Sequence, residues 1–346
     1  METYNSMQRV LTTLGHREPD RVPFFLLVTM HGAKELGMSI KEYFSTGAHV
    51  AEGQLRMQAR YRHDCLYGFF HAPLEAQAWG GEVIFHEDGP PNSGQPAITD
   101  IESIIRLEAP SIAKATCLHP VLESLRLMKA RVGDTVPIIG VVMSPFSLPV
   151  MQLGFDHYLD LIFERPDLFQ ALMRINTEFC VSWANAQLAA GATAICYFDP
   201  LASPTLIPRE VYQTTGFKTA CETISRIKGP TATHMASGRC RGIADLLPQT
   251  GTAAVAVCAD EDLENLKNSC RGKVSLIGNL NGIAMRTWTP EVARQTVREA
   301  ILKGAPGGGF ILSDQHGEIP FQVPDEILMT ISDTVRSYGS YPLQPR

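Results

Sequence analysis

The segment THMASGRC (233–240) places a single histidine, His234, at the end of an apolar, strand-like run. A histidine in that position could ligate a metal, transfer a proton, or make an ordinary hydrogen bond at the end of a strand. Cys240 follows six positions later and could join a metal site only if the loop bends back toward the histidine. The segment by itself leaves these roles open.

Two further runs end in groups suited to the same chemistry. The segment SDQHGEIP (313–320) brings His316 and Glu318, and Asp199 follows the buried run ATAICYF. Histidine and carboxylate side chains are the usual general acids and bases. A set of His234, His316 and Glu318 or Asp199 would also suit zinc or another divalent cation held by nitrogen and oxygen. The alternative is a set of hydrogen-bonded residues in a metal-free pocket, with Asp199 capping the loop that follows it.

A second group of residues near the ends of predicted strands could contact a substrate. Histidine, methionine and tyrosine would suit a wall that faces a flat molecule, although methionines often only fill gaps in a core. The two asparagines of GNLNG could bind a substrate or satisfy the backbone of a turn. These candidates are His31, Met143, Tyr197, Asn279 and Asn281.

The elements that must position these residues alternate between short apolar runs and longer helical patterns. Several runs are apolar throughout, which is typical of strands buried on both faces of a parallel sheet. The segment TPEVARQTVREAILKG (289–304) has the capping threonine and early proline of a helix start. The predicted strands are 22–28, 65–70, 137–143, 192–198, 230–235, 253–258, 273–279 and 308–313.

Eight strands that alternate with helices predict a (β/α)8 barrel of the TIM type, preceded by an N-terminal helical extension. A doubly wound open sheet is the alternative, because the number of strands read from one sequence is uncertain. We expect a single domain over residues 1–346, with the turn-rich segment 86–98 as a surface excursion. In a barrel the carboxyl ends of all strands meet at one rim, so the candidate residues should gather there.

Composition restricts the classes of function. The 346 residues are 45% hydrophobic and 19% charged, with a net charge of -6, so no basic surface for nucleic acid or an anionic membrane is expected. No apolar run is long enough to span a bilayer, and the N-terminus lacks the core of a signal peptide. The eight cysteines include no CxxC pair and suit reduced thiols in a cytoplasmic protein.

Five stretches together resemble the uroporphyrinogen decarboxylase superfamily. They occur in the expected order over nearly the whole chain, and the resemblance implies the same barrel fold. The stretches are HREPDRVPF, PLEAQAWGGEVIF, YFDPLASPTLIP, LIGNLNG and GGFILSDQHGEIPFQVP.

The resemblance favours one branch of that superfamily. True decarboxylases carry N-terminal arginines that hold the carboxylates of the tetrapyrrole, but VPFFLLVTMHGAKELG (22–37) contains no arginine. The segments DPLAS and GGFILS are more similar to the methylcobamide methyltransferase branch. That likeness implies a corrinoid-dependent methyltransferase that works with a separate corrinoid protein and a small methyl donor or acceptor.

The chain departs from the metal pattern of that branch. Many of its members hold zinc through a His-x-Cys pair and a cysteine after the last strand, whereas this chain has Ala236 and His316 at those places. The resemblance therefore implies His234, His316 and Glu318 as an altered metal set and, with Asp199, as the catalytic residues. A site without thiolates suits a methyl ether better than a thiol, which predicts O-demethylation.

Two alternatives to this methyltransferase function stay open at this point. One is a decarboxylase of a small carboxylated compound or a tetrapyrrole, in which His316 and Gly317 would echo the His-Gly pair that true decarboxylases carry near this place. The other is a barrel that binds a corrinoid or an aromatic ligand without turnover. Release of carbon dioxide without a corrinoid would indicate the first, and ligand binding without transfer would indicate the second.

Overall fold

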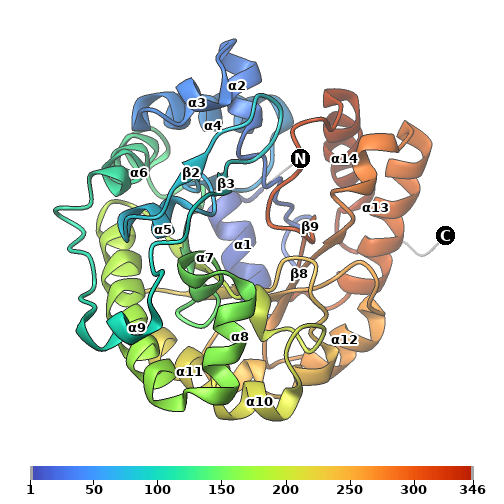
Figure 1. The fold of residues 1–346 in the computed structure, drawn as a ribbon. Coiled ribbons are helices and arrows are strands. Elements are labelled where there is room, and N and C mark those ends of the chain that lie inside the picture. The colour runs from blue at the N-terminus through green and yellow to red at the C-terminus, as the bar shows by residue number, and fades with distance from the viewer. Residues whose placement is uncertain (1–2, 344–346) are drawn as a thin grey trace.

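A computed structural model of the chain describes residues 3–343, and its central element is a curled parallel sheet of seven strands (Figure 1). Each strand pairs in parallel with the next along the chain, as expected for successive β–α units. The strands are β1 (Leu66–Tyr67), β4 (Ile138–Met143), β5 (Ala194–Phe198), β6 (Thr231–His234), β7 (Ala254–Ala256), β8 (Ser275–Leu280) and β9 (Phe310–Asp314).

The extended segment 22–28 closes this sheet into a barrel. Phe24 forms a parallel bridge with Leu312 of β9, and the backbone N–H of Phe25 donates to the Leu312 carbonyl over 2.8 Å. On the other side, the N–H of Asp64, just before β1, donates to the Phe24 carbonyl over 2.8 Å. The segment therefore stands where an eighth strand would stand, and the predicted (β/α)8 barrel is confirmed.

Helices surround the barrel in a ring (Figure 1). At the start of α13, the Thr289 side chain accepts the Val292 N–H and Pro290 occupies the first turn, as the sequence predicted. The longer helices are α4 (Gly47–Tyr61), α6 (His119–Val132), α8 (Phe155–Glu164), α9 (Pro166–Ala189), α11 (Gly216–Arg226), α12 (Leu263–Cys270), α13 (Pro290–Gly304) and α14 (Asp325–Tyr338).

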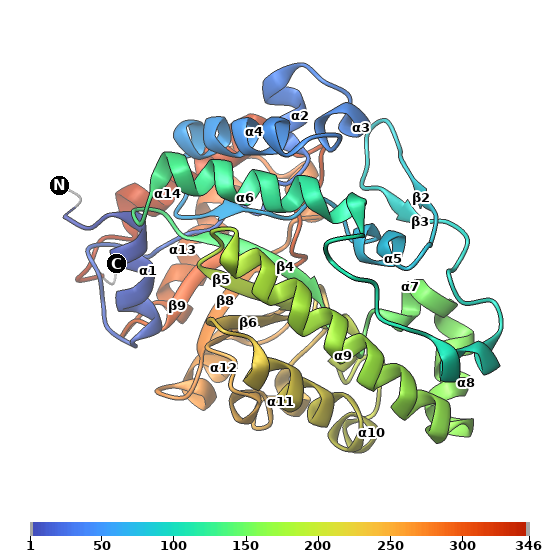
Figure 2. The same cartoon turned by 90° about the vertical axis from the view of Figure 1, so that its left-hand side faces the viewer.

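One helix covers the end of the barrel where the strands begin. Val10 of α1 (Ser6–Leu14) packs into the same apolar cluster as the residues that line the barrel interior. Figure 2 shows α1 at this end. This helix is the predicted N-terminal extension, and it leaves the opposite end of the barrel for chemistry.

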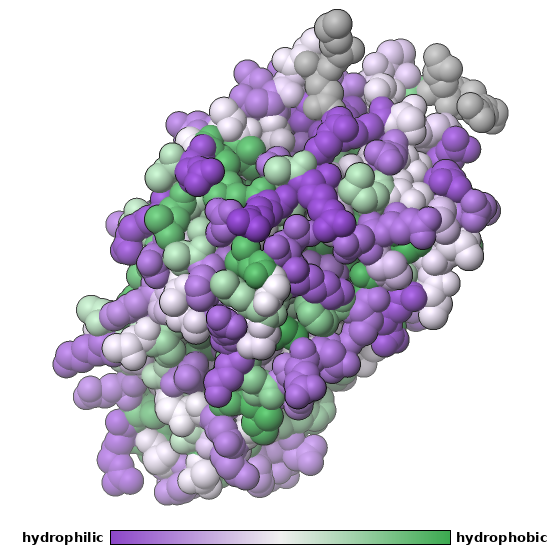
Figure 3. Space-filling model, turned by 90° about the horizontal axis from the view of Figure 1, so that it is seen from above, coloured by the Kyte–Doolittle hydropathy of each residue, from purple (hydrophilic) through white to green (hydrophobic). Residues whose placement is uncertain are grey.

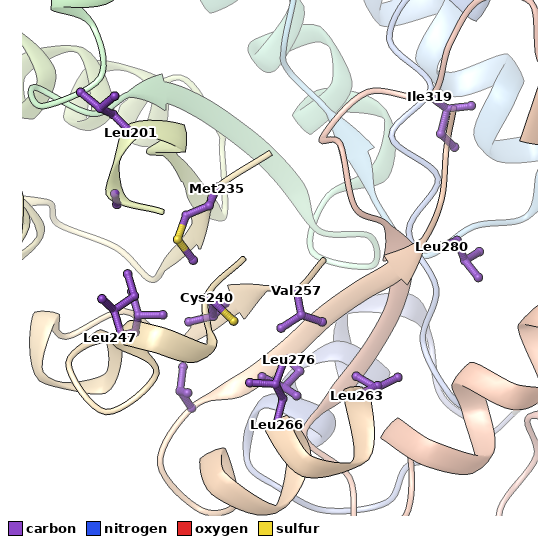
Figure 4. Packing of buried hydrophobic residues seen from close by; sticks show 14 of the residues in the cluster. Leu201, Met235, Cys240, Leu247, Val257, Leu263, Leu266, Leu276, Leu280 and Ile319 are labelled. Carbon is purple, nitrogen blue, oxygen red and sulfur yellow. The ribbon is translucent and has the colours of Figure 1, made fainter. Parts of the chain in front are cut away.

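The interior of the barrel is filled by alternate residues of the strands, because successive side chains of a strand point to opposite faces. The intervening residues pack outward against the helices in two larger apolar clusters, part of which Figure 4 shows. The inward residues include Phe25, Leu27, Tyr67, Val141, Cys196, Ala254, Ala256, Ile277 and Ile311.

Short elements gather at the other end of the barrel, formed by the carboxyl ends of the strands, which we call the mouth. Figure 2 shows the hairpin of β2 (Val83–Ile84) and β3 (Asn92–Ser93) there, which confirms a surface excursion around residues 86–98. The remaining short helices are α2 (His31–Leu36), α3 (Ile40–Tyr43), α5 (Leu74–Ala78), α7 (Pro149–Leu153) and α10 (Arg209–Thr214).

The outer surface is mixed in character. The face seen in Figure 3 is largely hydrophilic, and its apolar residues stand in small groups among hydrophilic ones. Within residues 3–343, every helix is too short or too polar to cross a lipid bilayer.

Candidate active site at the mouth of the barrel

His234 ends β6 and points into the barrel, two residues after the inward-facing Ala232. The backbone N–H of Ala236 donates to its Nδ1 over 3.0 Å, from a left-handed conformation with φ of 49°. Burial lowers the pKa of His234 to about 3, and the neighbouring His316 adds to this, so the ring is neutral. Because Nδ1 accepts a hydrogen bond, we assign the proton to Nε2, which finds no partner among the described residues.

The segment 315–324, which we call the β9–α14 loop, folds across the mouth above His234. Gly317 has φ of +82°, and a Cβ atom on it would lie 3.4 Å from His234 Nε2 and 3.1 Å from the Phe198 ring. The ring of Phe198 itself lies 5.4 Å from that of His234, between centroids. The absence of a side chain at residue 317 therefore lets the backbone lie directly on the histidine.

Two carboxyl groups, Asp314 and Glu318, lie at the same place. Asp314 Oδ2 accepts the N–H groups of His316 and Gly317 over 2.9 and 3.0 Å, whereas its Oδ1 is buried without a partner in the described structure. Burial raises the pKa of Asp314 to about 7. Burial also raises the pKa of Glu318 to about 7, with Asp314 adding to the rise, while a hydrogen bond from Thr29 opposes it.

Asp314 was not among the residues singled out from the sequence. Burial raises the pKa of the Cys196 thiol inside the barrel to about 12, and the Asp314 carboxyl adds to that rise. The Asp314 carboxyl, at the end of β9, is therefore close enough to the barrel interior to raise the pKa of a group there. Its position directly after the predicted strand 308–313 was the only signal in the sequence.

His316 lies beside His234, as the effect of its charge on that ring indicates. Its Nδ1 contacts the Ser237 hydroxyl, and its Nε2 lies 3.1 Å from Gln315 Nε2 and 3.4 Å from Asn281 Oδ1. Partial burial lowers the pKa of His316. The structure thus brings together four predicted site residues, His234, His316, Glu318 and Asn281, from three different parts of the chain.

These side chains do not fit a zinc site. Within residues 3–343, no three histidine, cysteine, aspartate or glutamate side chains are placed to hold one metal ion. A ligating histidine normally donates its second ring N–H to an oxygen atom, whereas His234 Nδ1 accepts an N–H. We therefore assign no step of chemistry to a metal.

Cys240 does not complete a metal site either. Its side chain packs in an apolar cluster with Met235, Leu247 and Val257 (Figure 4), and only 2% of the residue is exposed. Its backbone N–H donates to both carboxylate oxygens of Glu261, at 3.0 and 2.9 Å. The loop therefore turns this thiol into the core.

Asp199 and Tyr197 lie outside the mouth. Asp199 Oδ1 accepts hydrogen bonds of 2.6 Å from the hydroxyls of Ser144 and Ser147, in the layer between the sheet and the helices. Burial raises its pKa to about 6. Tyr197 precedes the inward-facing Phe198 and packs in the same outer layer as Cys180 of α9. In this arrangement both residues support the fold rather than face the barrel.

The remaining candidates occupy the rim. Asn279 Nδ2 donates to the Cys258 carbonyl over 3.2 Å, and Asn281 Oδ1 also accepts the Ala284 N–H over 3.0 Å, so both have turn contacts. His31 is buried at the start of α2, with its ring 6.1 Å from that of Phe321. Burial lowers the pKa of His31 to about 3.

Met143 at the end of β4 is buried and donates its N–H to Glu75 over 2.8 Å. Glu75, in the first turn of α5, is a second buried carboxyl that was not singled out from the sequence. Its residue is only 5% exposed, and burial raises its pKa to about 8. Since it lies in the wall that holds Met143, we treat it as part of the scaffold.

The chain is similar to proteins of known sequence over most of its length. The sequence model of the uroporphyrinogen decarboxylase family matches residues 5–338. A uroporphyrinogen decarboxylase of Xylella fastidiosa is 26% identical, covering 92% of this chain and 95% of its own. The methylcobamide:CoM methyltransferase MtbA of Methanosarcina mazei is 23% identical, covering 84% of this chain and 87% of its own.

Solved structures show the same fold. A methyltransferase from Methanosarcina mazei superimposes with a TM-score of 0.84, covering 97% of this chain and 99% of its own, at 20% identity. A B12-independent methionine synthase from Shewanella sp. W3-18-1 follows with a TM-score of 0.58 at 16% identity, covering 86% and 89% of the two chains. At these identities the likeness concerns the fold alone.

Proposed function

We propose a function from the premise that this chain belongs to the uroporphyrinogen decarboxylase family. We propose that the protein is a methyltransferase, which moves a methyl group between a small substrate and a corrinoid carried by a separate protein. Relatives named as methylcobamide:CoM methyltransferases support this reading, although relatives named as decarboxylases match over a similar length. The choice between the two activities depends on the side chains at the mouth.

The observation that carries the proposal is the charge of the mouth. Asp314 and Glu318 stand beside two histidines, and burial lowers the pKa of both rings. Neither carboxyl is paired with lysine or arginine in the described part of the chain. A tetrapyrrole with many carboxylates needs cations around it, and this site offers acids instead.

We further propose that the methyl donor is a methyl ether, so that the reaction is an O-demethylation. His234 Nε2–H, which has no partner among the described residues, would donate a hydrogen bond to the ether oxygen. The carbon–oxygen bond breaks with its electron pair left on oxygen, and the cobalt(I) corrinoid of the partner accepts the methyl group. Glu318 or Asp314 in its protonated form supplies the proton that yields the alcohol or phenol.

Apolar side chains around the mouth suit the approach of a partner protein. They come from four separate segments of the chain, which makes them a rim rather than one patch. Each is 41–50% exposed: Ile84 of β2, Phe155 of α8, Leu206 after β5 and Ile283 after β8. A corrinoid must come within bonding distance of the methyl carbon, so the partner would dock over this rim.

The rival activities are separable by experiment. Purified protein would be incubated with methoxylated aromatic compounds, with and without reduced cobalamin, while methylcobalamin and carbon dioxide are both measured. The proposal expects methylcobalamin and the demethylated product in equal amounts. Carbon dioxide released without cobalamin would show a decarboxylase, and binding of the compounds without either product would show a binding protein.

A further inference from the structure

We propose that the mouth selects substrates by charge. It admits a methyl ether whose group beside Asp314 and Glu318 is neutral or cationic, and it excludes an ether that carries a carboxylate at that position. This inference rests on the proposed function and names the class of substrate that the same site takes. It follows from the groups that line the mouth, from their unused hydrogen-bonding atoms, and from the cost of placing an anion among them.

Three buried polar atoms at the mouth lack hydrogen-bond partners among the described residues: His234 Nε2, Ser313 Oγ and Asp314 Oδ1. The exposed fractions of these residues are 4%, 1% and 1%. Ser313 follows the inward-facing Ile311 by two positions and so points into the barrel, as His234 does. Unpaired polar groups at such depth are costly in a folded protein, which indicates that a ligand completes them.

The three atoms belong to one place. Gly317 connects His234 and Asp314, because its N–H donates to Asp314 Oδ2 while a Cβ on it would lie 3.4 Å from His234 Nε2, and Ser313 precedes Asp314 in β9. Glu318 follows directly and is close enough for the charge of Asp314 to act on its carboxyl. A bound molecule would therefore meet one donor on its β6 side and acceptors on its β9 side.

The lysine and arginine side chains nearest to Asp314 and Glu318 do not contact these two carboxyl groups. Lys34 of α2 contacts the backbone and ring of Phe321 instead of the acids. Arg239, on the loop after β6, is 62% exposed and lies 4.0 Å from Asp260. His234 adds no positive charge, because its Nδ1 accepts the Ala236 N–H and the ring therefore carries its single proton on Nε2.

An anion placed beside these carboxyls would meet repulsion that solvent screens poorly. A hydroxyl or ammonium group, in contrast, could donate to Asp314 Oδ1, while the ether oxygen accepts from His234 Nε2. The same arrangement therefore provides an attractive contact for one class of substrate and a repulsive one for the other, which is how a specific site separates related molecules.

A matched series of ligands tests this inference. Calorimetric titration at pH 8 would compare meta-methoxybenzyl alcohol, meta-methoxybenzylamine and meta-methoxybenzoate, which share one methoxyphenyl ring and carry a neutral, a cationic and an anionic substituent. We expect the alcohol and the amine to bind at least about tenfold more tightly than the benzoate. The Asp314→Asn variant should lose most of that preference, whereas Asp333→Asn, at an exposed position of α14, should keep it.

The outcomes of this experiment test charge selection and the proposed methyltransferase activity separately. Equal or tighter binding of the benzoate to the unmodified protein would overturn charge selection, whether or not any methyl group is transferred. The expected order of affinities, with no transfer from any ether to reduced cobalamin, would support the selective site and count against the methyltransferase activity. Because the first comparison uses the unmodified protein, it does not depend on the folding of a variant.

Discussion

The backbone N–H of Ala236 donates to Nδ1 of His234 across 3.0 Å, and this contact fixes which side of the ring carries the proton. Residue 236 is the position where the resemblance leads one to expect a cysteine ligand. Here it contributes its backbone instead, and the histidine presents a hydrogen-bond donor to the mouth. The substitution is therefore consistent with a change from metal chemistry to hydrogen bonding.

The role of His234 predicts the effect of removing its ring. His234→Ala should lower kcat for methyl transfer roughly 10²–10³-fold, because the leaving oxygen loses a preorganised donor. The rate would be measured with reduced cobalamin and a methyl ether. His157→Ala, at an exposed position of α8, is the matched control and should retain full activity. Equal rates for the two variants would contradict the assigned role.

The donor set of the mouth predicts that activity does not depend on zinc. Elemental analysis of purified protein should find well below one equivalent of zinc, and dialysis against a chelator should leave methyl transfer unchanged. The reason is that His234 accepts an N–H at Nδ1 and that Cys240 is buried among apolar side chains. One equivalent of zinc, lost together with activity in His234→Ala, would refute this.

The close approach of Gly317 predicts that a methyl group there is not tolerated. Gly317→Ala places a Cβ 3.1 Å from Phe198 and 3.4 Å from His234 Nε2, at φ of +82°. We expect a loss of about 1–3 kcal/mol in the free energy of unfolding, measured with urea, and at least a tenfold loss of activity. Gly89→Ala, where a Cβ would meet nothing within 4 Å, is the control and should change neither quantity.

The buried Glu75 predicts a pH dependence of stability. Burial raises its pKa from 4.5 to about 8, so the folded protein holds a proton that the unfolded chain loses above about pH 4.5. Its contribution to the free energy of unfolding is therefore complete at low pH and decreases as the pH rises toward 8.

Glu75→Gln should make that decrease shallower, by up to about 1.4 kcal/mol per pH unit within this interval. Urea unfolding from pH 5 to pH 8.5 would measure it, with the exposed Glu326→Gln as control. Parallel curves for the wild type and Glu75→Gln would show that Glu75 does not titrate in this way.

The barrel was predictable because its strands are buried on both faces and so appear as continuous apolar runs. Each of the eight predicted runs overlaps a strand or, for residues 22–28, the extended segment that closes the barrel, and β8 and β9 each end one residue beyond their runs. The rim position of His234 and His316 followed from the same rule, since both come after such runs.

The direction of individual side chains was not predictable in the same way. In a run that is apolar throughout, the sequence does not show which of the two alternating sets of side chains faces the barrel interior. Tyr197 packs outward and Phe198 lies beside His234, although both are aromatic residues of the same run. Asp199 points into the outer layer, where Ser144 and Ser147 bind it, and these serines are far from it in sequence. The tautomer of His234 depends on a backbone turn at Ala236, which the sequence did not reveal.

Transfer of a labelled methyl group tests the central claim most directly. The full chain would be mixed with reduced cobalamin and a methyl ether whose methoxy carbon is carbon-13, and the carbon resonances followed by NMR. The account predicts that the label moves to cobalt in step with formation of the demethylated product, and much more slowly in His234→Ala. Label that stays in the ether while a carboxylated substrate releases carbon dioxide would contradict it.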